Sequence, residues 1–235
     1  MSLEEDAIRF AKANRTKIAR ELTDINTYPP SEIPVSVFMA GSPGAGKTEF
    51  SKGILSLIAK EYKTVPLRVD SDDLRSRIPG YSGSNSSEVQ RAVSFILERI
   101  YDFVLDNNQT AIIDGTLSRF EKAKSNIERS LHKSRTVFVF YIYQDPTIAW
   151  KFTTAREKIE GRNIPKSAFI QQFLGARETV KQIHEEFRER VRIIVVRKNF
   201  QTNDIESISK LSSHGPTMDD VIPELYTEQQ LERLL

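Results

Sequence analysis

The sequence predicts an α/β fold in three layers, with a mostly parallel sheet between two layers of helices. Short runs that consist almost entirely of apolar residues alternate along the chain with longer segments of helical periodicity. Strands that are apolar on both faces are typical of a parallel sheet that helices cover on both sides. The helices between them supply the crossovers that parallel strands need.

Five apolar runs are expected to be strands, because β-branched and aromatic residues are frequent in them. The second and third of these runs each end in an aspartate, and the fourth is the most apolar. The expected strands are 33–40, 65–70, 110–114, 136–143 and 191–196.

Six longer segments are expected to be helices, because apolar residues recur in them at intervals of three and four positions. The third shows this most clearly, at Val89, Val93, Ile96 and Ile100, and Ser87 could cap it. The first has only a sparse apolar stripe. The expected helices are 3–25, 47–61, 88–106, 119–132, 146–160 and 166–189.

The remaining segments are expected to be loops, apart from a short docking helix at 227–235. Segments 76–86 and 199–218 are rich in the residues that favour turns. The expected division of the chain is an N-terminal helix and lead-in at 1–32, a central α/β domain at 33–198, and a C-terminal linker with a short helix at 199–235.

Length and composition fit one globular core. The 235 residues are 39% hydrophobic and 28% charged, and the net charge of +2 argues for neither a nucleic-acid nor a membrane partner. The chain has no cysteine, which excludes disulfides and thiolate metal sites. The acidic start at 1–6 does not resemble a signal peptide, and no apolar run approaches the roughly 18 residues of a membrane span. We therefore expect a cytoplasmic protein.

A glycine-rich loop follows the first expected strand and precedes a helix, which is the context that the Walker A motif requires. Its backbone N–H groups surround phosphates, and its glycines are expected to take positive φ. Its lysine can reach the β- and γ-phosphates, and its threonine offers a hydroxyl to Mg²⁺. The motif predicts that the chain binds a nucleoside triphosphate. Its residues are Gly41, Ser42, Pro43, Gly44, Ala45, Gly46, Lys47 and Thr48.

Three acids lie at the end of the second expected strand or directly after it, at the edge of the sheet where α/β proteins bind ligands. Asp70, Asp72 and Asp73 could hold Mg²⁺, accept a proton from an attacking hydroxyl, or hydrogen-bond a sugar. Acids are also favoured in the first turn of a helix by the helix dipole. A position beside a bound triphosphate favours a functional role over this structural one.

The third expected strand ends in Asp114, Gly115 and Thr116. An apolar strand that ends in Asp is similar to a Walker B motif, in which the carboxylate holds Mg²⁺ directly or through water. The Gly-Thr pair instead indicates a tight turn that presents polar groups to a substrate, and Asp114 could also cap the next helix. The sequence leaves these roles open.

Two arginines are candidates for stabilising a transferring phosphoryl group, whose negative charge spreads over three oxygens. Arg156 lies on an expected helix, and Arg162 follows Gly161 at the turn before the next one. A turn between Gly161 and Pro165 could let Arg162 swing over the site as part of a lid. Any single arginine of this arginine-rich chain could also be solvated.

Four elements in this order resemble the zeta-toxin family of P-loop kinases. They are the phosphate loop with its flanks at 38–49, the acidic element at 70–81, the Asp-Gly-Thr-Leu turn at 114–117, and Arg156 with the turn at 161–165. The resemblance covers about residues 5–197 and implies a P-loop kinase-like fold with a helical lid.

The resemblance implies a kinase that uses ATP or GTP with Mg²⁺ and acts on UDP-N-acetylglucosamine at the 3′-hydroxyl of the sugar. The product of this reaction poisons cell-wall synthesis, so the protein would be the toxin of a toxin–antitoxin system. An antitoxin protein would then be its partner. The helix at 3–25 could bind such a partner, although we expect it to cap the sheet instead.

The resemblance also implies roles for single residues. Asp72 is the base that accepts the proton of the acceptor hydroxyl, and Thr48 holds Mg²⁺. The γ-phosphate is held by Lys47, Arg156 and Arg162. The acceptor is bound by Asp70, Arg75, Tyr81, Asp114 and Thr116.

The sequence departs from the family pattern in three ways. Ile78 stands where the family usually has His, and Asp114 stands where some members have Glu. The pair Arg156 and Arg162 is also more closely spaced than in some members. Other acceptor hydroxyls therefore stay open, on an antibiotic, a nucleoside cofactor or a polynucleotide end. The near-neutral charge weighs against the polynucleotide. A nucleotide-dependent interaction module without catalysis is the alternative from another class, but it would need neither Asp72 nor two arginines.

Overall fold

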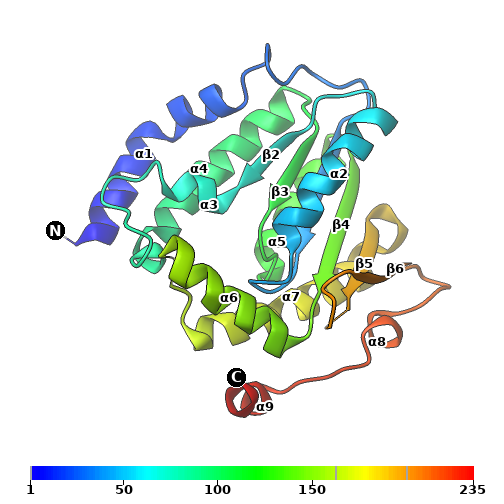
Figure 1. Ribbon diagram of the computed structural model, residues 1–235. Helices are drawn as coiled ribbons and strands as arrows, with labels where there is room; N and C mark the ends of the chain where they lie inside the picture. Colours follow the sequence, from blue (N-terminus) through cyan, green and yellow to red (C-terminus); the bar gives the residue numbers. More distant parts are fainter. Residues whose placement is uncertain (1, 162, 200) are drawn as a thin grey trace.

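The computed structural model describes residues 2–161, 163–199 and 201–235, and it confirms the predicted α/β fold. These residues form a six-stranded sheet in the order β2-β3-β1-β4-β5-β6 (Figure 1). The first five strands pair in parallel, and β6 is antiparallel to β5. The strands are β1 (Val35–Ala40), β2 (Leu67–Asp70), β3 (Ala111–Asp114), β4 (Thr136–Tyr143), β5 (Arg192–Lys198) and β6 (Ile205–Lys210).

Helices connect the parallel strands and cover the sheet on both sides. In Figure 1, α1 and α4 lie at the β2 end of the sheet, while α6 lies below the carboxyl ends of the strands. The helices are α1 (Leu3–Leu22), α2 (Lys47–Glu61), α3 (Ser71–Arg75), α4 (Ser86–Asp106), α5 (Phe120–His132), α6 (Pro146–Glu160), α7 (Lys166–Phe187), α8 (Met218–Val221) and α9 (Glu228–Leu234), with a short 3₁₀ helix at Arg188–Arg190.

The central strand β1 is buried along its whole length, and its alternate residues contribute to two different cores. Val37 and Met39 pack with Ile54 of α2 on one face of the sheet. Phe38 and Ala40 belong to the larger cluster on the other face, which α4, α5 and α7 cover. This arrangement explains why the first strand reads as a continuous apolar run.

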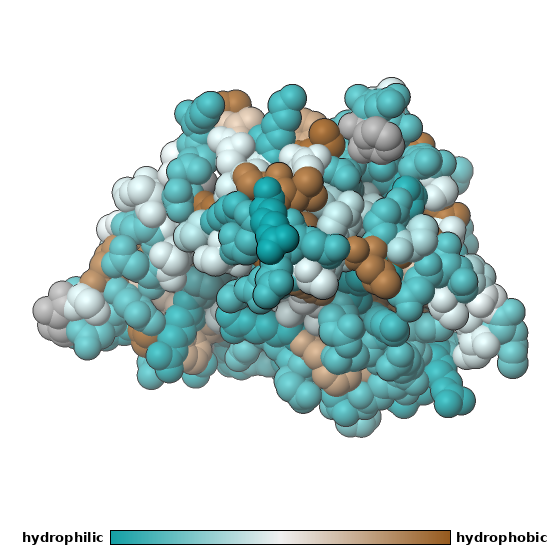
Figure 2. All heavy atoms as spheres, turned by 90° about the horizontal axis from the view of Figure 1, so that it is seen from below, coloured by the Kyte–Doolittle hydropathy of each residue, from teal (hydrophilic) through white to brown (hydrophobic). Residues whose placement is uncertain are grey.

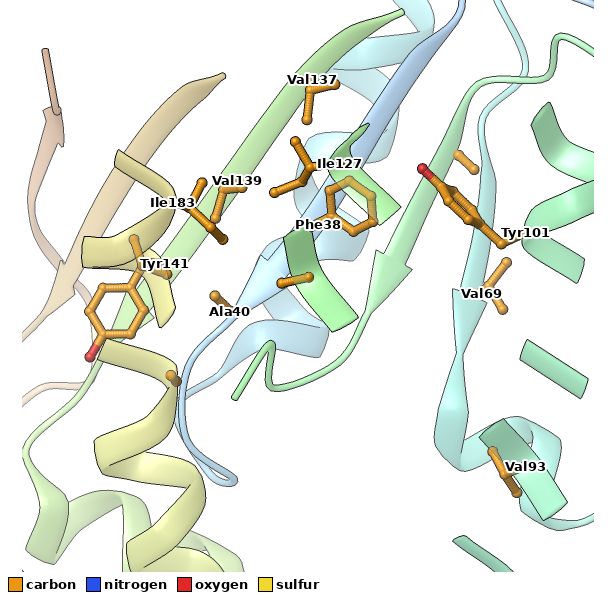
Figure 3. Packing of buried hydrophobic residues seen from close by; sticks show 14 of the residues in the cluster. Phe38, Ala40, Val69, Val93, Tyr101, Ile127, Val137, Val139, Tyr141 and Ile183 are labelled. Atoms are coloured by element: carbon orange, nitrogen blue, oxygen red, sulfur yellow. The ribbon is translucent and has the colours of Figure 1, made fainter. Parts of the chain in front are cut away.

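The larger core is built around fully buried side chains of strands and helices. Figure 3 shows Phe38 and Val139 of neighbouring strands together with Ile127 of α5 and Ile183 of α7. Phe38 also meets the ring of Tyr101 edge-on, with the ring centroids 5.8 Å apart. Truncation of such a buried phenylalanine to alanine typically lowers the free energy of unfolding by about 3–5 kcal/mol.

Helix α1 packs along α4, so it covers a helix of the fold instead of capping the sheet directly as we expected. Small residues, Ala7, Ala11 and Ala19, are buried on its inner face and allow the two helices to approach closely. The helix ends at Leu22, and the next residue, Thr23, donates its hydroxyl to the carbonyl oxygen of Ala19 at 2.8 Å.

The expectation that 199–218 is a loop is wrong in its middle part. Residues Ile205–Lys210 form β6, which pairs with β5 and widens the sheet. Ile205 and Ile208 are 48% and 60% exposed, because β6 is an edge strand without a packed face. Its polar sequence lacks the apolar pattern from which a strand can be predicted. The segment also contains the beginning of α8.

Candidate functional site

The phosphate loop lies between β1 and α2 at the carboxyl edge of the sheet. Its glycines have positive φ, as expected, with 135° at Gly41, 72° at Gly44 and 84° at Gly46. A Cβ on Gly41 would lie 2.3 Å from the carbonyl oxygen of Ile142, and one on Gly44 would lie 2.1 Å from that of Ala149. At these two positions the backbone conformation and the available space both require glycine.

The loop is prepared to hold an anion. Gly46 caps α2 without a side-chain hydrogen bond, so the first N–H groups of this helix are open to a ligand. Lys47 Nζ donates to the carbonyl oxygen of Ser42 at 2.6 Å, which holds its ammonium group over the loop. The hydroxyl-bearing Thr48 follows on the side of the cavity described below.

The turn after β3 is hydrogen-bonded to the start of this loop. The Gly41 N–H donates to the carbonyl oxygen of Thr116 at 3.1 Å, and the Thr116 hydroxyl lies 3.1 Å from that of Ser118. Asp114 is only 4% exposed, and its Oδ2 accepts a hydrogen bond from the Ser51 hydroxyl of α2 at 2.7 Å. The turn therefore fixes both the start of the loop and the helix that follows it.

Arg68 of β2 joins the acids of the site. Its Nη2 lies 2.6 Å from Asp70 Oδ2 and 2.5 Å from Asp114 Oδ2, while its Nη1 lies 4.0 Å from Asp73 Oδ2. Burial alone would lower the pKa of Arg68, but the hydrogen bonds and charges of Asp114 and Asp70 outweigh it and raise this pKa above its ordinary value. Arg68 is not among the residues that we proposed from the sequence. An arginine inside an otherwise apolar strand is the signal that could have indicated it.

Helix α3 places the acids that follow β2. Asp70 caps the helix, because its Oδ1 accepts a hydrogen bond from the Asp72 N–H at 2.9 Å. Asp72 and Asp73 lie in the first turn, so the helix-dipole interpretation of these acids is correct and compatible with a place in the site. Arg75 is buried, forms an ion pair with Asp72, and donates from Nη2 to Gln90 Oε1 at 2.6 Å. It holds the Asp72 carboxylate from behind.

A cavity of about 420 Å³ opens beside the phosphate loop and brings together residues of α2, β2, α3 and α6. The residues proposed from the sequence that line it are Thr48, Asp70, Asp72, Tyr81 and Arg156. Asp73, Lys52 and Arg68 complete the lining. Lys52 was also missed, although it lies one helical turn after Thr48 and therefore on the same face of α2.

The other candidate residues lie elsewhere. Arg75, Asp114 and Thr116 do not line the cavity and instead contact the residues that do, or the phosphate loop. Arg162 lies outside the described residues. Ile78, which stands where the family pattern usually has His, is 2% exposed and packs in the larger hydrophobic core.

The face of the molecule that is seen from below the view of Figure 1 is mostly hydrophilic. Figure 2 shows that the hydrophobic residues on this face form small separate groups. Among the described helices, none combines the length and the apolar content that crossing a bilayer would need. Within the same residues, no three His, Cys, Asp or Glu side chains are grouped as a metal site.

The fold and the site together define a P-loop protein that has a charged cavity beside its phosphate loop. The sequence model of the zeta toxin family matches residues 18–208, which is most of the chain. This protein therefore belongs to the zeta toxin family, as the resemblance of its motifs implies.

Solved structures share the fold at low sequence identity. One from the PezAT chromosomal toxin–antitoxin system of Streptococcus pneumoniae is 16% identical with a TM-score of 0.67, covering 95% of this chain and 91% of that one. The native AvrRxo1-ORF1:-ORF2 complex is 15% identical with a TM-score of 0.60, covering 89% of this chain and 66% of that one. The same complex with ATP is 16% identical with a TM-score of 0.57, covering 89% and 64%. A comparison with curated proteins finds no match.

Proposed function

We propose that this protein is a kinase that transfers the γ-phosphate of ATP or GTP to a hydroxyl of a nucleotide-activated sugar. The proposed acceptor is UDP-N-acetylglucosamine at the 3′-hydroxyl of its sugar, and the proposed role is that of a toxin, which the family supports. The observation that carries the proposal is that Thr48, Asp72 and Arg156 line one cavity beside the phosphate loop. An enzyme that only hydrolysed a nucleotide would need no such second polar cavity.

The donor would bind at the phosphate loop and the N-terminus of α2, where N–H groups and Lys47 can hold its phosphates. Mg²⁺ prefers oxygen ligands, and the cavity offers the Thr48 hydroxyl together with the carboxylate of Asp73. We assign Thr48 to hold this ion, which when bound would neutralise charge on the β- and γ-phosphate oxygens. A neighbouring structure solved with ATP supports a nucleotide donor.

Asp72 is assigned as the base, because its partly exposed carboxylate lines the cavity and Arg75 fixes its orientation. The acceptor hydroxyl oxygen would form a bond to the γ-phosphorus while the bond from that phosphorus to the leaving nucleoside diphosphate breaks. The hydroxyl proton would pass to Asp72. Arg156 and Arg162 would hold the phosphoryl oxygens as negative charge spreads over them.

The five residues that the resemblance assigns to the acceptor form two groups in this proposal. Asp70 and Tyr81 line the cavity and would contact the acceptor directly. Arg75 would act by holding Asp72. Asp114 and Thr116 would act by holding Arg68, α2 and the phosphate loop.

We also propose that a separate antitoxin protein restrains this kinase. The similar PezAT structure is described as part of a toxin–antitoxin system, and the similar AvrRxo1 structures are complexes of AvrRxo1-ORF1 with AvrRxo1-ORF2. The apolar side of α1 packs on α4, so this helix would offer a partner its charged side.

The test is transfer of radioactive γ-phosphate from ATP to a panel of nucleotide sugars in the presence of Mg²⁺. The wild-type protein should label UDP-N-acetylglucosamine. The Asp72→Asn variant should bind ATP as before and transfer phosphate about two to four orders of magnitude more slowly, because the base is lost.

Absence of label on every nucleotide sugar would refute the proposed acceptor class. Label on a different sugar would correct the acceptor and leave the phosphoryl transfer in place. Unchanged turnover by Asp72→Asn would remove Asp72 from the role of base.

A further inference from the structure

Lys198 brings an ammonium group to the phosphate loop from the side opposite the acidic cavity. A Cβ placed on Gly46 would lie 3.6 Å from Lys198 Nζ and 3.9 Å from its Cε. Lys198 is the last residue of β5, whereas the acids of the cavity follow β2. Because β1 lies between β2 and β5 in the sheet, the loop has the acids on one side and Lys198 on the other.

The preceding residue, Arg197, forms ion pairs with carboxylates of the same chain. Its Nη1 donates to Glu224 Oε2 at 2.9 Å, and its Nε donates to Glu206 Oε2 at 3.0 Å. Its guanidinium group lies 5.8 Å from the ring centroid of Tyr143. In the part of the chain that the structure describes, Lys198 forms no comparable ion pair. Glu49 Oε2 also approaches the same Cβ position, at 3.8 Å, but the described residues show no ion pair between it and Lys198.

A small pocket of about 130 Å³ lies next to Lys198. It is lined by Tyr143, Asp145, Arg197, Lys198 and Glu224. A whole nucleoside needs more space than this, so the pocket cannot enclose one. Arg197 compensates the charge of Glu224, which would otherwise repel an anion near Lys198. Glu224 lies beyond the residues 18–208 that the family model matches, so this support is a feature of the C-terminal segment of this chain.

We propose that Lys198 binds the phosphate chain of the donor nucleotide where that chain crosses Gly46. The inference rests on the proposed function only in taking a nucleoside triphosphate as the ligand of the loop. Loop N–H groups face the α- and β-phosphates, while Lys47 reaches the β- and γ-phosphates. Lys198 thus holds the nucleoside-proximal part of the chain, and Lys47 holds the end that is transferred.

The test is isothermal titration of the full-length protein with ADP and with inorganic tripolyphosphate. One charge-assisted hydrogen bond corresponds to about tenfold in affinity or more. Lys198→Gln should weaken both ligands by about this factor, because both lose the same phosphate contact. Lys198→Arg keeps the charge and should restore most of the affinity. The matched control is Lys210→Gln, at an exposed lysine of β6, which should bind both ligands like the wild type.

Two results would overturn the proposal. The first is a Lys198→Gln protein, with an unchanged thermal unfolding midpoint, that binds both ligands as tightly as the wild type. The second is a loss of ADP affinity without any loss of tripolyphosphate affinity, because that would place the contact on the nucleoside instead of the phosphates.

This experiment is independent of the acceptor. A wild-type protein that binds ADP through Lys198 but phosphorylates no nucleotide sugar would refute the proposed function and support this inference. A wild-type kinase whose nucleotide affinity does not change in Lys198→Gln would refute this inference alone.

Discussion

Two arginines, the mostly buried Arg68 and the fully buried Arg135, lie at opposite edges of the same sheet and have different kinds of partner. Arg68 lies in β2 near the carboxyl edge, where it contacts the carboxylates of Asp70 and Asp114. Arg135 immediately precedes β4 at the other edge and is 3% exposed. Its partners are neutral: Nε donates to the Ser36 hydroxyl at 2.7 Å, and Nη2 donates to the carbonyl oxygens of Val35, at 3.0 Å, and Gln109.

The difference is visible in the pKa values of the two guanidinium groups. Burial lowers the pKa of Arg135 to about 10, with little to oppose it. Burial acts on Arg68 in the same direction, but its two carboxylate partners reverse the effect and raise the pKa. A buried cation can thus be held by neutral groups where only structure is needed. At the carboxyl edge of the sheet, Arg68 instead forms an ionised network with Asp70 and Asp114, beside the loop where we propose that a triphosphate binds.

The largest effect is expected from Arg68→Met. The change leaves the carboxylates of Asp70 and Asp114 buried without their cation, which should lower the free energy of unfolding by about 3–5 kcal/mol. Phosphate transfer should also fall by about a hundredfold or more, because Arg68 lines the cavity. Denaturant unfolding and the transfer assay measure the two effects. A stable and active Arg68→Met protein would show that the network is dispensable.

A smaller and purely structural effect is expected from Arg135→Met. No carboxylate is left without a cation, and the lost hydrogen bonds to Ser36 and two carbonyl groups should cost about 1–3 kcal/mol. The same denaturant unfolding, run beside the Arg68 variant, gives this value. Activity per folded molecule should equal that of the wild type. A loss of activity as large as that of Arg68→Met would remove the distinction between the two edges.

A still smaller effect is expected from Ser51→Ala, which removes the 2.7 Å hydrogen bond from α2 to Asp114 but keeps Arg68. Asp114 retains its stronger partner, so stability should fall by about 1 kcal/mol. Thermal or urea unfolding measures this change. A double variant with Arg68→Met should be less destabilised than the sum of the two, because the 2.9 Å hydrogen bond from Arg68 Nε to Ser51 Oγ is already lost in either single variant. Strict additivity would contradict a shared network.

The smallest effect is expected from Asp73→Asn. Burial and then the charge of Asp70 raise the pKa of Asp73 above its ordinary 3.8, so the folded state binds this proton more tightly than the unfolded state. That favourable contribution is complete below pH 3.8 and is lost as the pH rises through the folded-state pKa. At pH 7 the variant should therefore be slightly more stable, by ~0.3 kcal/mol, because the side chain is 80% exposed.

Unfolding free energies of wild type and Asp73→Asn across pH 3 to 7 measure this trend. The gain in the variant should shrink as the pH falls. A variant that is less stable than the wild type at pH 7 would show that Asp73 is held favourably as an anion.

The elements that depend on local pattern could be predicted from the sequence. The phosphate loop, its glycine conformations and the parallel strands follow from spacing and apolar runs. The partners of Arg68 could not be predicted, because Asp114 comes from another strand 46 residues away. Strand β6 was missed for a related reason, since only its pairing with β5 makes that polar segment a strand.

Some of the residues proposed for the site line one cavity in the structure, but their arrangement could not be predicted from the sequence. The sequence placed Arg75 and Asp114 among the groups that bind the acceptor, and the structure places both behind the cavity, against its lining residues. Whether a polar side chain faces a cavity or supports a neighbour depends on burial. Burial is decided by packing between distant segments.

We propose that the cavity beside the phosphate loop binds an acceptor whose hydroxyl Asp72 deprotonates. The most direct measurement is mass spectrometry of a metabolite extract after incubation with ATP, Mg²⁺ and either wild-type or Asp72→Asn protein. We predict that one nucleotide sugar, UDP-N-acetylglucosamine, gains the mass of one phosphoryl group with the wild type and not with the variant. An extract in which no metabolite gains a phosphoryl group, or in which both proteins modify it equally, would contradict the account.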